Sequence, residues 1–254
     1  MTLYYAVGGG LGHQARAQRV LRALGLDHAE IMTSADLPAD LEGDREAHRR
    51  WLEPRTRGRH VIVDAFPAGI QGELSGIEGA TFDHVARLLR WKSYREAVPF
   101  DPPYFATTYV VEGLDGEHEA MIRANSERVV TLALSPPLPS EPEVSLAAPY
   151  SLIVHSGPTP EVEELVAYAR ELGDHAFHVV TRCDVALPEG FHRLTTDRPF
   201  DYFERAERLV TAAGFNVMLE TEPWRHKRHI VPFPRRYDDQ FLRAARARRP
   251  TPAS

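Results

Sequence analysis

A histidine behind a glycine-rich loop is the first side chain whose type and place suit catalysis. Residues 3–7 form an apolar run that predicts a strand, the chain then reads G-G-G-L-G-H from Gly8 to His13, and helical periodicity follows up to Gly25. Strand, glycine loop and helix open a nucleotide-binding domain, although this loop is neither a G-x-G-x-x-G motif nor a P-loop. A neutral imidazole here could deprotonate a hydroxyl group or a water, and its cation could steady a phosphate. A helix-capping histidine that packs locally is the alternative.

Two acids follow the next predicted strand. Residues 60–65 read HVIVDA, which predicts a buried strand ending at Asp64, and a glycine-rich stretch continues to Glu73. At the carboxyl end of a strand, Asp64 could orient His13 or bind an acceptor. An Asx turn that caps the loop backbone is the alternative for Asp64.

A second set of polar side chains lies near the C-terminus. Residues 209–213 and 229–233 predict two buried strands, with Gly214 as the turn after the first and a helix behind it that Asn216 could cap. In a parallel α/β unit, this turn and the positive helix end lie at the carboxyl edge of the sheet, where phosphates bind. Glu220, one helical turn later, could then receive ribose hydroxyl groups.

The residues after the second of these strands fall on the same edge of the sheet. They include the acids Asp238 and Asp239 and the amide of Gln240. An earlier strand, at residues 151–154, is followed by a Ser-Gly pair and by a predicted helix over 161–172. Ser156 and the amide of Gly157 are therefore further phosphate-binding candidates, although the acidic first turn of that helix already satisfies its dipole.

These strings resemble a known family. G-F-N-x-x-x-E, from Gly214 to Glu220, and D-D-Q, ending at Gln240, are similar to the donor-binding half of GT-B glycosyltransferases. The branch that they resemble contains the N-acetylglucosaminyl transferase of peptidoglycan synthesis. The loop G-G-x-x-G-H resembles the same branch, and G-L-G-H-x-x-R also resembles hydrolases of nucleotide-activated sugars. The resemblance implies an α/β fold with two Rossmann-like domains facing a cleft, of which the first is shortened.

The resemblance also implies roles for individual residues. It places phosphates at Gly214 and Asn216, ribose at Glu220 and the sugar hydroxyl groups at Gln240. The predicted catalytic residues are His13 and Asp64. The full set of predicted donor-binding residues is Gly10, Gly12, Ser156, Gly157, Gly214, Phe215, Asn216, Glu220, Asp239 and Gln240.

Composition sets the class of protein. The 254 residues are 43% apolar and 26% charged, as in ordinary globular proteins, and the net charge of -6 argues against a nucleic-acid partner. The single cysteine, Cys183, fits a reducing compartment, and no apolar run is long enough to span a membrane. We therefore expect a cytoplasmic protein. Residues 84–94 predict an amphipathic helix with nearby basic side chains, which would allow a peripheral membrane contact.

Proline density predicts the domain boundary. Residues 135–149 contain five prolines without a helical or strand period, which favours an extended linker. We thus expect an acceptor-side α/β domain over 1–134, a donor-binding α/β domain over 150–245 and a disordered tail over 246–254.

The leading hypothesis is transfer of a hexose from a UDP-linked nucleotide-sugar to a hydroxyl acceptor, without a cofactor or a metal ion. The sequence contains neither D-x-D nor H-E-x-x-H, which are common metal-binding strings. A nucleotide-sugar hydrolase or epimerase on the same fold is one alternative, and a non-catalytic module that binds a nucleotide or a partner is another. The sequence leaves the acceptor, the sugar and the oligomeric state open.

Overall fold

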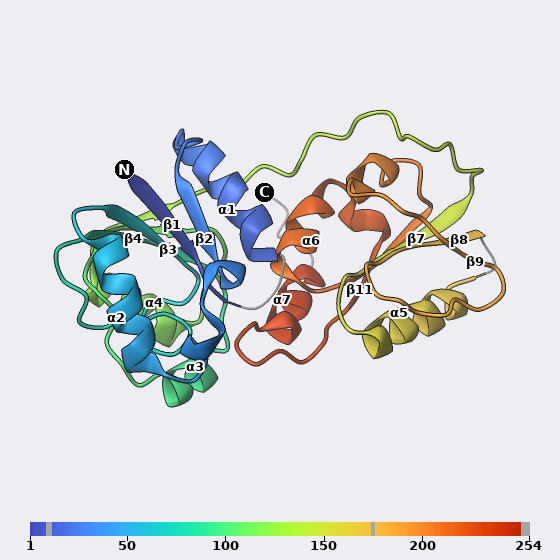
Figure 1. The fold of residues 1–254 in the computed structure, drawn as a ribbon. Coiled ribbons are helices and arrows are strands. Elements are labelled where there is room, and N and C mark those ends of the chain that lie inside the picture. The colour runs from blue at the N-terminus through green and yellow to red at the C-terminus, as the bar shows by residue number, and fades with distance from the viewer. Residues whose placement is uncertain (9–11, 174–175, 250–254) are drawn as a thin grey trace. The chain divides into compact units, whose positions relative to one another are not determined.

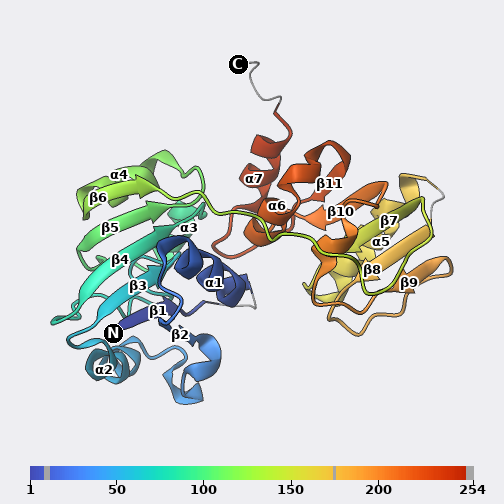
Figure 2. The same ribbon diagram turned by 90° about the horizontal axis from the view of Figure 1, so that it is seen from above.

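The structure is a computed structural model that describes residues 1–8, 12–173 and 176–249. Its contacts divide the chain into two units. The first holds Met1–Leu134 and Arg236–Asp238, and the second holds Ser135–Arg235 and Asp239–Ser254. Each unit is built on its own parallel sheet (Figures 1 and 2).

In the described part of unit 1, six parallel strands have the order β2-β1-β3-β4-β5-β6. The strands are β1 (Thr2–Ala6), β2 (Glu30–Thr33), β3 (His60–Asp64), β4 (Thr81–Ala86), β5 (Phe105–Val110) and β6 (Ser126–Thr131). The α-helices are α1 (Gly12–Leu24), α2 (Arg45–Thr56), α3 (Trp91–Ala97) and α4 (Gly116–Ala124), with short 3-10 helices at Ser34–Asp36 and Ala39–Leu41.

The central strands of unit 1 are buried on both faces, which is why they read as continuous apolar runs. Successive side chains of β1 point to opposite faces of the sheet. Tyr4 joins a core cluster with Val20 of α1, whereas Tyr5 joins another with Leu52 of α2. Helix α1 thus packs on one face of the sheet and α2 on the other. The two neighbouring tyrosines therefore reach two different polar networks.

In the described part of unit 2, five parallel strands have the order β11-β10-β7-β8-β9. They are β7 (Tyr150–Val154), β8 (Ala176–Val180), β9 (Phe191–Arg193), β10 (Arg208–Ala212) and β11 (Arg228–Val231). The helices are α5 (Thr159–Glu171), α6 (Phe215–Glu220) and α7 (Gln240–Ala247), with 3-10 helices at Pro199–Tyr202 and Glu222–Lys227.

The apolar face of α5 covers one face of the second sheet. Leu165 and Ala169 pack in one cluster with Ile153 of β7 and Val210 of β10. The residues between the sheets, 135–149, contain no helix or strand. They are nevertheless attached to unit 2, since Ser140 donates from its amide and its hydroxyl group to the carboxylate of Asp201.

The prediction of a helix over residues 84–94 is wrong. The chain there forms the end of β4, a loop and the start of α3. Asp83 and His84 are polar but buried, because Asp83 accepts from the Thr107 amide and contacts His60, and His84 contacts the Ala65 carbonyl. These partners come from other strands and loops, so periodicity along the chain could not reveal them.

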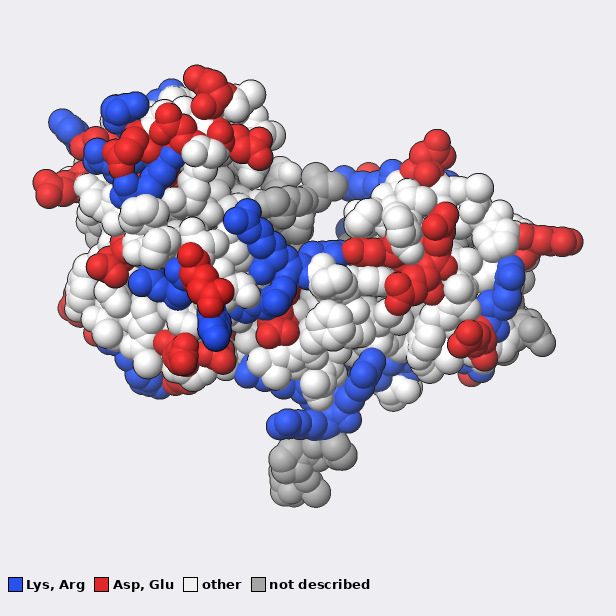
Figure 3. All heavy atoms as spheres, turned by 90° about the horizontal axis from the view of Figure 1, so that it is seen from below, with Lys and Arg blue, Asp and Glu red and all other residues white. Residues whose placement is uncertain are grey.

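This correction removes the reason for expecting a membrane contact. The basic side chains do not line one helical face, because Arg87 precedes the helix and pairs with Asp238 while Lys92 lies within α3. Among the described residues, no helix has the length and apolar character that crossing a bilayer requires. On the face drawn in Figure 3, both basic and acidic side chains reach the surface.

Two helix ends also differ from expectation. Gly214, not Asn216, is the N-cap of α6, so Asn216 is the second helical residue. The last helix, α7, continues through Arg246 and Ala247, two residues into the predicted tail. Its buried residues, which include Arg243 and Ala244, fix it to unit 2.

Candidate active site

The predicted catalytic residues lie where the strand order of unit 1 changes direction. β1 pairs with β2 on one side and with β3 on the other, so the connections after β1 and β3 leave the sheet side by side at its carboxyl edge. Ligands of open α/β sheets bind at such a switch point. His13, the second residue of α1, follows β1, and Asp64 is the last residue of β3.

The structure brings these two side chains into contact. Nδ1 of His13 lies 2.7 Å from Oδ2 of Asp64, and both side chains are almost fully buried. An ionised carboxylate only accepts hydrogen bonds, which assigns the proton of the neutral imidazole to Nδ1. Nε2 of His13 then keeps its lone pair, the state that a general base requires.

Asp64 is held by three side chains. Its Oδ1 accepts from the Tyr4 hydroxyl group at 3.0 Å and from Nε of Arg16 at 2.8 Å, and its Oδ2 also accepts from Nη2 of Arg16 at 2.5 Å. Burial alone would raise the pKa of Asp64, but Arg16 and His13 outweigh it and hold this pKa well below its usual range. Asp64 is therefore a permanent negative charge that orients His13.

Arg16 moderates the basicity of His13. Its Nη2 lies 3.0 Å from Nδ1 of His13, and because both atoms carry protons in the assigned tautomer, this contact is a repulsive approach and no hydrogen bond. Burial lowers the pKa of His13, Asp64 raises it, and the charges of Arg16 and Arg87 lower it again, so the net pKa lies below the ordinary value. His13 is thus neutral near pH 7.

The backbone of the first loop touches the imidazole. A Cβ atom on Gly8 would lie 2.7 Å from Cε1 of His13 and equally close to the ring of Phe66, so only glycine allows this approach. Of the two donor-binding glycines predicted in this loop, Gly12 is the first residue of α1, and Gly10 lies outside the described residues.

A strained turn follows Asp64. Ala65 has a φ of 65°, and the Phe66 amide donates to the Asp64 carbonyl at 2.8 Å. A residue other than glycine rarely adopts a positive φ, and such strain persists where neighbouring groups enforce it. His84 supplies one such contact, because its Nε2 lies 3.3 Å from the Ala65 carbonyl and must donate to it. Burial lowers the pKa of His84 to about 4, which keeps its ring neutral.

The segment 236–238 completes the surroundings of this turn. The ring of Phe66 stacks on Tyr94 and meets Tyr237 edge-on. Asp238 next to it forms an ion pair with Arg87, whose charge acts on His13. The sequence predicted that Asp238 lies at the edge of the donor sheet, whereas its contacts assign it to unit 1.

Glu73 belongs to a separate network on the other face of the sheet. Nε2 of Gln71 lies 2.9 Å from Nδ1 of His48, and Nε2 of His48 lies 3.1 Å from the Tyr5 hydroxyl group. That hydroxyl group donates to the Glu73 carboxylate at 2.6 Å. The same carboxylate accepts from the amides of Ile70 and Gln71. Since Glu73 is completely buried and these partners use both of its oxygens, its role is to hold the loop.

Unit 2 has its own switch point. β7 lies between β10 and β8, so the connections after β7 and after β10 are neighbours at the carboxyl edge. The first contains Ser156 and Gly157, and the second contains Gly214. Ser156, Gly157 and Gly214 thus lie at the edge where phosphates bind in this class of fold.

The turn after β10 would accommodate a side chain at Gly214. Gly214 has an ordinary φ of −68°, and the nearest atom to a Cβ placed on it is 3.9 Å away, so the unliganded fold does not require glycine there. Phe215 is buried, whereas Asn216 and Glu220 are half-buried and stand four residues apart, on one face of α6. This face could present an amide and a carboxylate to one ligand.

The loop after β7 is less open. Ser156 is exposed, but Gly157 lies against the side chains of His155 and Glu161. Glu161 accepts from both His155 and Arg235, so a carboxylate of the protein itself occupies the start of α5.

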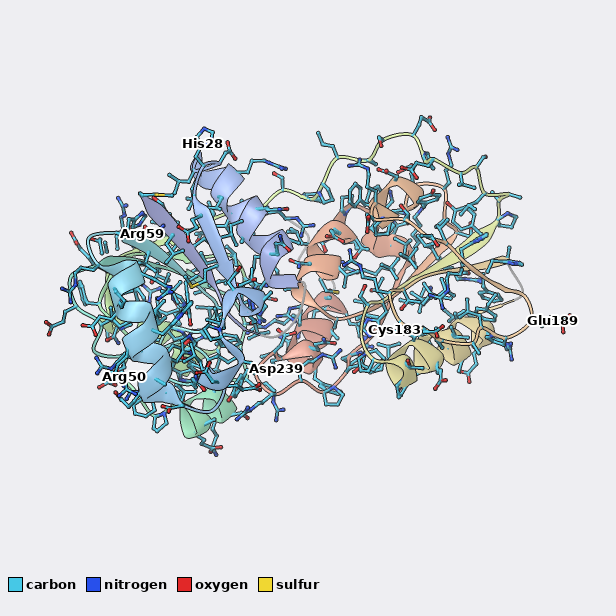
Figure 4. All side chains as sticks on the ribbon, viewed as in Figure 1. His28, Arg50, Arg59, Cys183, Glu189 and Asp239 are labelled. Atoms are coloured by element: carbon cyan, nitrogen blue, oxygen red, sulfur yellow. The ribbon has the colours of Figure 1, made fainter. Side chains whose placement is uncertain are left out.

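Asp239 and Gln240 have structural partners. Asp239, which Figure 4 labels at the start of α7, caps this helix by accepting from the Leu242 amide. Gln240 is buried, and its Oε1 accepts from the Phe233 amide at 3.0 Å. Their contacts with a donor therefore stay predictions that must coexist with these bonds.

Cys183 is a packing residue. It is half-buried beside the core of unit 2, and its Sγ contacts the Gly157 carbonyl near the start of α5 (Figure 4). Among the described residues, no three His, Cys, Asp or Glu side chains are grouped so that they could hold a metal ion.

Comparison with known proteins shows the fold. The chain is similar to the glycotransferase of kitacinnamycin, with a TM-score of 0.54 and 14% identity over 97% of this chain and 83% of that one. It also matches CalG4, the calicheamicin glycosyltransferase (TM-score 0.49, 13% identity, 97% and 81% covered), and the glycosyltransferase SnogD from Streptomyces nogalater (0.47, 11%, 96% and 84%). No family model and no curated protein matches.

The prediction of two Rossmann-like α/β domains of GT-B type is confirmed. The similarity to the peptidoglycan branch and to nucleotide-sugar hydrolases stays a prediction.

The structure adds residues that the sequence analysis did not assign to the site. Arg16 stands three residues after His13, so its position on the same helical face could have been inferred from G-H-x-x-R. Tyr4 gave no such signal, because the sequence does not show which partner the hydroxyl group of a buried strand tyrosine will contact. Tyr237 reaches Phe66 over more than 150 residues of sequence, a proximity that only tertiary structure creates.

Proposed function

We propose that this chain transfers a hexose from a UDP-linked nucleotide-sugar to a hydroxyl acceptor, with His13 as the general base and without a metal ion. The observation that carries the proposal is the buried His13–Asp64 pair at the switch point of unit 1. The similarity to the glycotransferase of kitacinnamycin supports it at the level of the fold.

The pair has the chemistry that this reaction needs. Nε2 of His13 would take the proton of the acceptor hydroxyl group as its oxygen forms a bond to the anomeric carbon. The bond from that carbon to the diphosphate would break, and the diphosphate would leave with the electron pair. Asp64, already ionised and bonded to Nδ1, would stabilise the imidazolium that results.

Unit 2 would bind the donor. In this proposal the loop at Gly214 meets the diphosphate, the Phe215 and Asn216 amides add donors, and Glu220 accepts from the ribose. Negative charge on the leaving group would be met by protein groups, so turnover should persist in a metal chelator.

Thermal unfolding with nucleotides gives the first test. A ligand at a hundred times its dissociation constant stabilises the fold by about 2.7 kcal/mol, or several degrees. We expect a shift with UDP that exceeds those with GDP, TDP and ADP and that is lost in Glu220→Ala. The absence of a melting-temperature shift with every nucleotide would count against a donor site.

Turnover tests the reaction itself. The protein is incubated with UDP-sugars, a panel of hydroxyl acceptors and EDTA, and the products are separated by mass. We expect a glycosylated acceptor with the wild type and a loss of about 10²-fold or more with His13→Ala. Full turnover by His13→Ala would refute the base assignment. Release of free sugar without an acceptor would indicate a hydrolase. A sugar that is altered but still linked to the nucleotide would indicate an epimerase, and unchanged nucleotide-sugar would indicate a binding module.

A further inference from the structure

An ionic cluster outside the His13 site joins three segments of unit 2. His155 follows β7, Glu161 lies in the first turn of α5, and Arg235 follows β11. Nη1 and Nη2 of Arg235 each lie 2.5 Å from an oxygen of Glu161, and Nε2 of His155 lies 2.7 Å from Oε2. The connections after β7 and β11 both leave the sheet at its carboxyl edge, and β7 is one of the two strands at the switch point.

Glu161 is held as a bound anion would be held. A planar guanidinium fork and a third N–H donor converge on its carboxylate, which is the geometry that recognises carboxylates and phosphates. The ring of His155 stacks on Phe233 with centroids 5.4 Å apart, so the direction of Nε2 is fixed. A Cβ on Gly157 would lie 2.2 Å from Nε2, so the loop backbone closes directly over the cluster.

The backbone of this loop offers little to an anion. Pro158 and Pro160 have no N–H group, and the Glu161 amide already donates to the Pro158 carbonyl. Of this loop, only the amides of Ser156, Gly157 and Thr159 remain as backbone donors, and the side chains of Arg235 and His155 add donors beside them.

The cluster is partly exposed. The side chain of Arg235 is 30% exposed and that of Glu161 is 14% exposed, so solvent and ligands reach the pair. Burial raises the pKa of Glu161, but hydrogen bonds from Arg235 and His155 outweigh it and lower the pKa, so the carboxylate is charged at neutral pH. Glu161 offers Arg235 one negative charge, whereas a diphosphate brings at least one more.

We propose that Arg235 and His155 bind the diphosphate of the nucleotide donor, and that Glu161 fills this site until the ligand displaces it. The class of ligand rests on the proposed function. Glu161 would then act as an internal competitor that weakens the affinity for every ligand that binds through a diphosphate and leaves the nucleoside contacts unchanged.

The test compares Glu161→Gln with Glu163→Gln. Both remove one charge from the start of α5, but Glu163 is exposed and no contact in the described structure joins it to Arg235. Binding of UDP, inorganic pyrophosphate and uridine is measured by calorimetry, with circular dichroism to verify folding. We expect Glu161→Gln to bind UDP and pyrophosphate about tenfold more tightly, equal to about 1.4 kcal/mol, and uridine unchanged. Arg235→Gln should weaken both anions, and Glu163→Gln should match the wild type.

The opposite results would overturn the proposal. Unchanged or weaker anion binding by folded Glu161→Gln would show that Glu161 is only a structural partner of Arg235. An equal gain in Glu163→Gln would indicate a general charge effect. If Glu161→Gln does not fold, pyrophosphate binding is measured with Glu161→Ala. Tighter binding would support Glu161 as an internal competitor, and unchanged or weaker binding would refute that role. Sugar transfer can fail while pyrophosphate binding responds as expected, so the two proposals are separated.

Discussion

Replacing Asp64 with Asn should both destabilise unit 1 and reverse the tautomer of His13. The carboxylate accepts four hydrogen bonds, two of them from Arg16, and the side chain of Arg16 is only 4% exposed. An amide of the same shape is neutral and presents N–H protons at one of the two positions. Asp64→Asn therefore removes the carboxylate charge that Arg16 pairs with, and it places an N–H group of the amide opposite an N–H donor of a neighbouring side chain.

The magnitude follows from the burial of the pair. Removing one partner of a buried ion pair costs about 3 to 5 kcal/mol, which lowers the melting temperature of a protein of this size by roughly 6 to 20 °C. Removing both partners is far milder, so adding Arg16→Met to Asp64→Asn should recover most of the loss. Asp197→Asn, at an exposed pair with Arg182, is the control and should cost less than about 1 kcal/mol.

Urea unfolding measures these free energies, and nitrogen-15 NMR of the histidine rings reports the tautomer. In the wild type we expect the His13 proton on Nδ1. In Asp64→Asn we expect a shift towards Nε2–H and the loss of general-base turnover. A stability within 0.5 kcal/mol of the wild type, or the same tautomer in both proteins, would refute this account of the site.

Further predictions concern glycines and a second buried histidine. Gly8→Ala should cost about 1 to 3 kcal/mol in urea unfolding because its Cβ would meet His13 at 2.7 Å, and a neutral result would contradict that contact. Gly214→Ala should change stability by less than about 1 kcal/mol, because the gain from replacing glycine offsets the poorer N-cap, yet it should weaken UDP binding in calorimetry; unchanged binding would remove Gly214 from the proposed donor site. His118 is fully buried on Trp91, neither ring nitrogen has a hydrogen-bond partner among the described residues, and burial lowers its pKa to about 3. Because the unfolded chain takes up this proton below pH 6.5 and the native state does not, stability should fall by about 2 kcal/mol between pH 8 and pH 5, and His118→Phe should remove that share of the loss. Identical pH profiles of urea unfolding for the two proteins would rule out a neutral buried His118.

The sequence by itself determined the class of fold and the sheet edge at which His13 and Asp64 lie. Buried parallel strands are continuous apolar runs, so residues 3–7 and 60–65 were recognisable, and the residues after them had to share one edge of a sheet. His13 and Asp64 could therefore be paired as a hypothesis before any contact was known. The GT-B type of the fold followed from local strings such as G-F-N-x-x-x-E, which carry the resemblance without tertiary contacts.

Only the tertiary structure decided what the charges do. β4 contains His84, which the sequence pattern assigned to a helix, and Asp83 before it, and partners from neighbouring strands and loops allow both to be buried. Arg16 shares the carboxylate of Asp64 with His13, which makes the imidazole less basic than a simple pair would be. Glu161 occupies donors that a ligand could use. Periodicity encodes burial along a chain, whereas the sharing of one charge among distant segments depends on distances that arise only when the chain has folded.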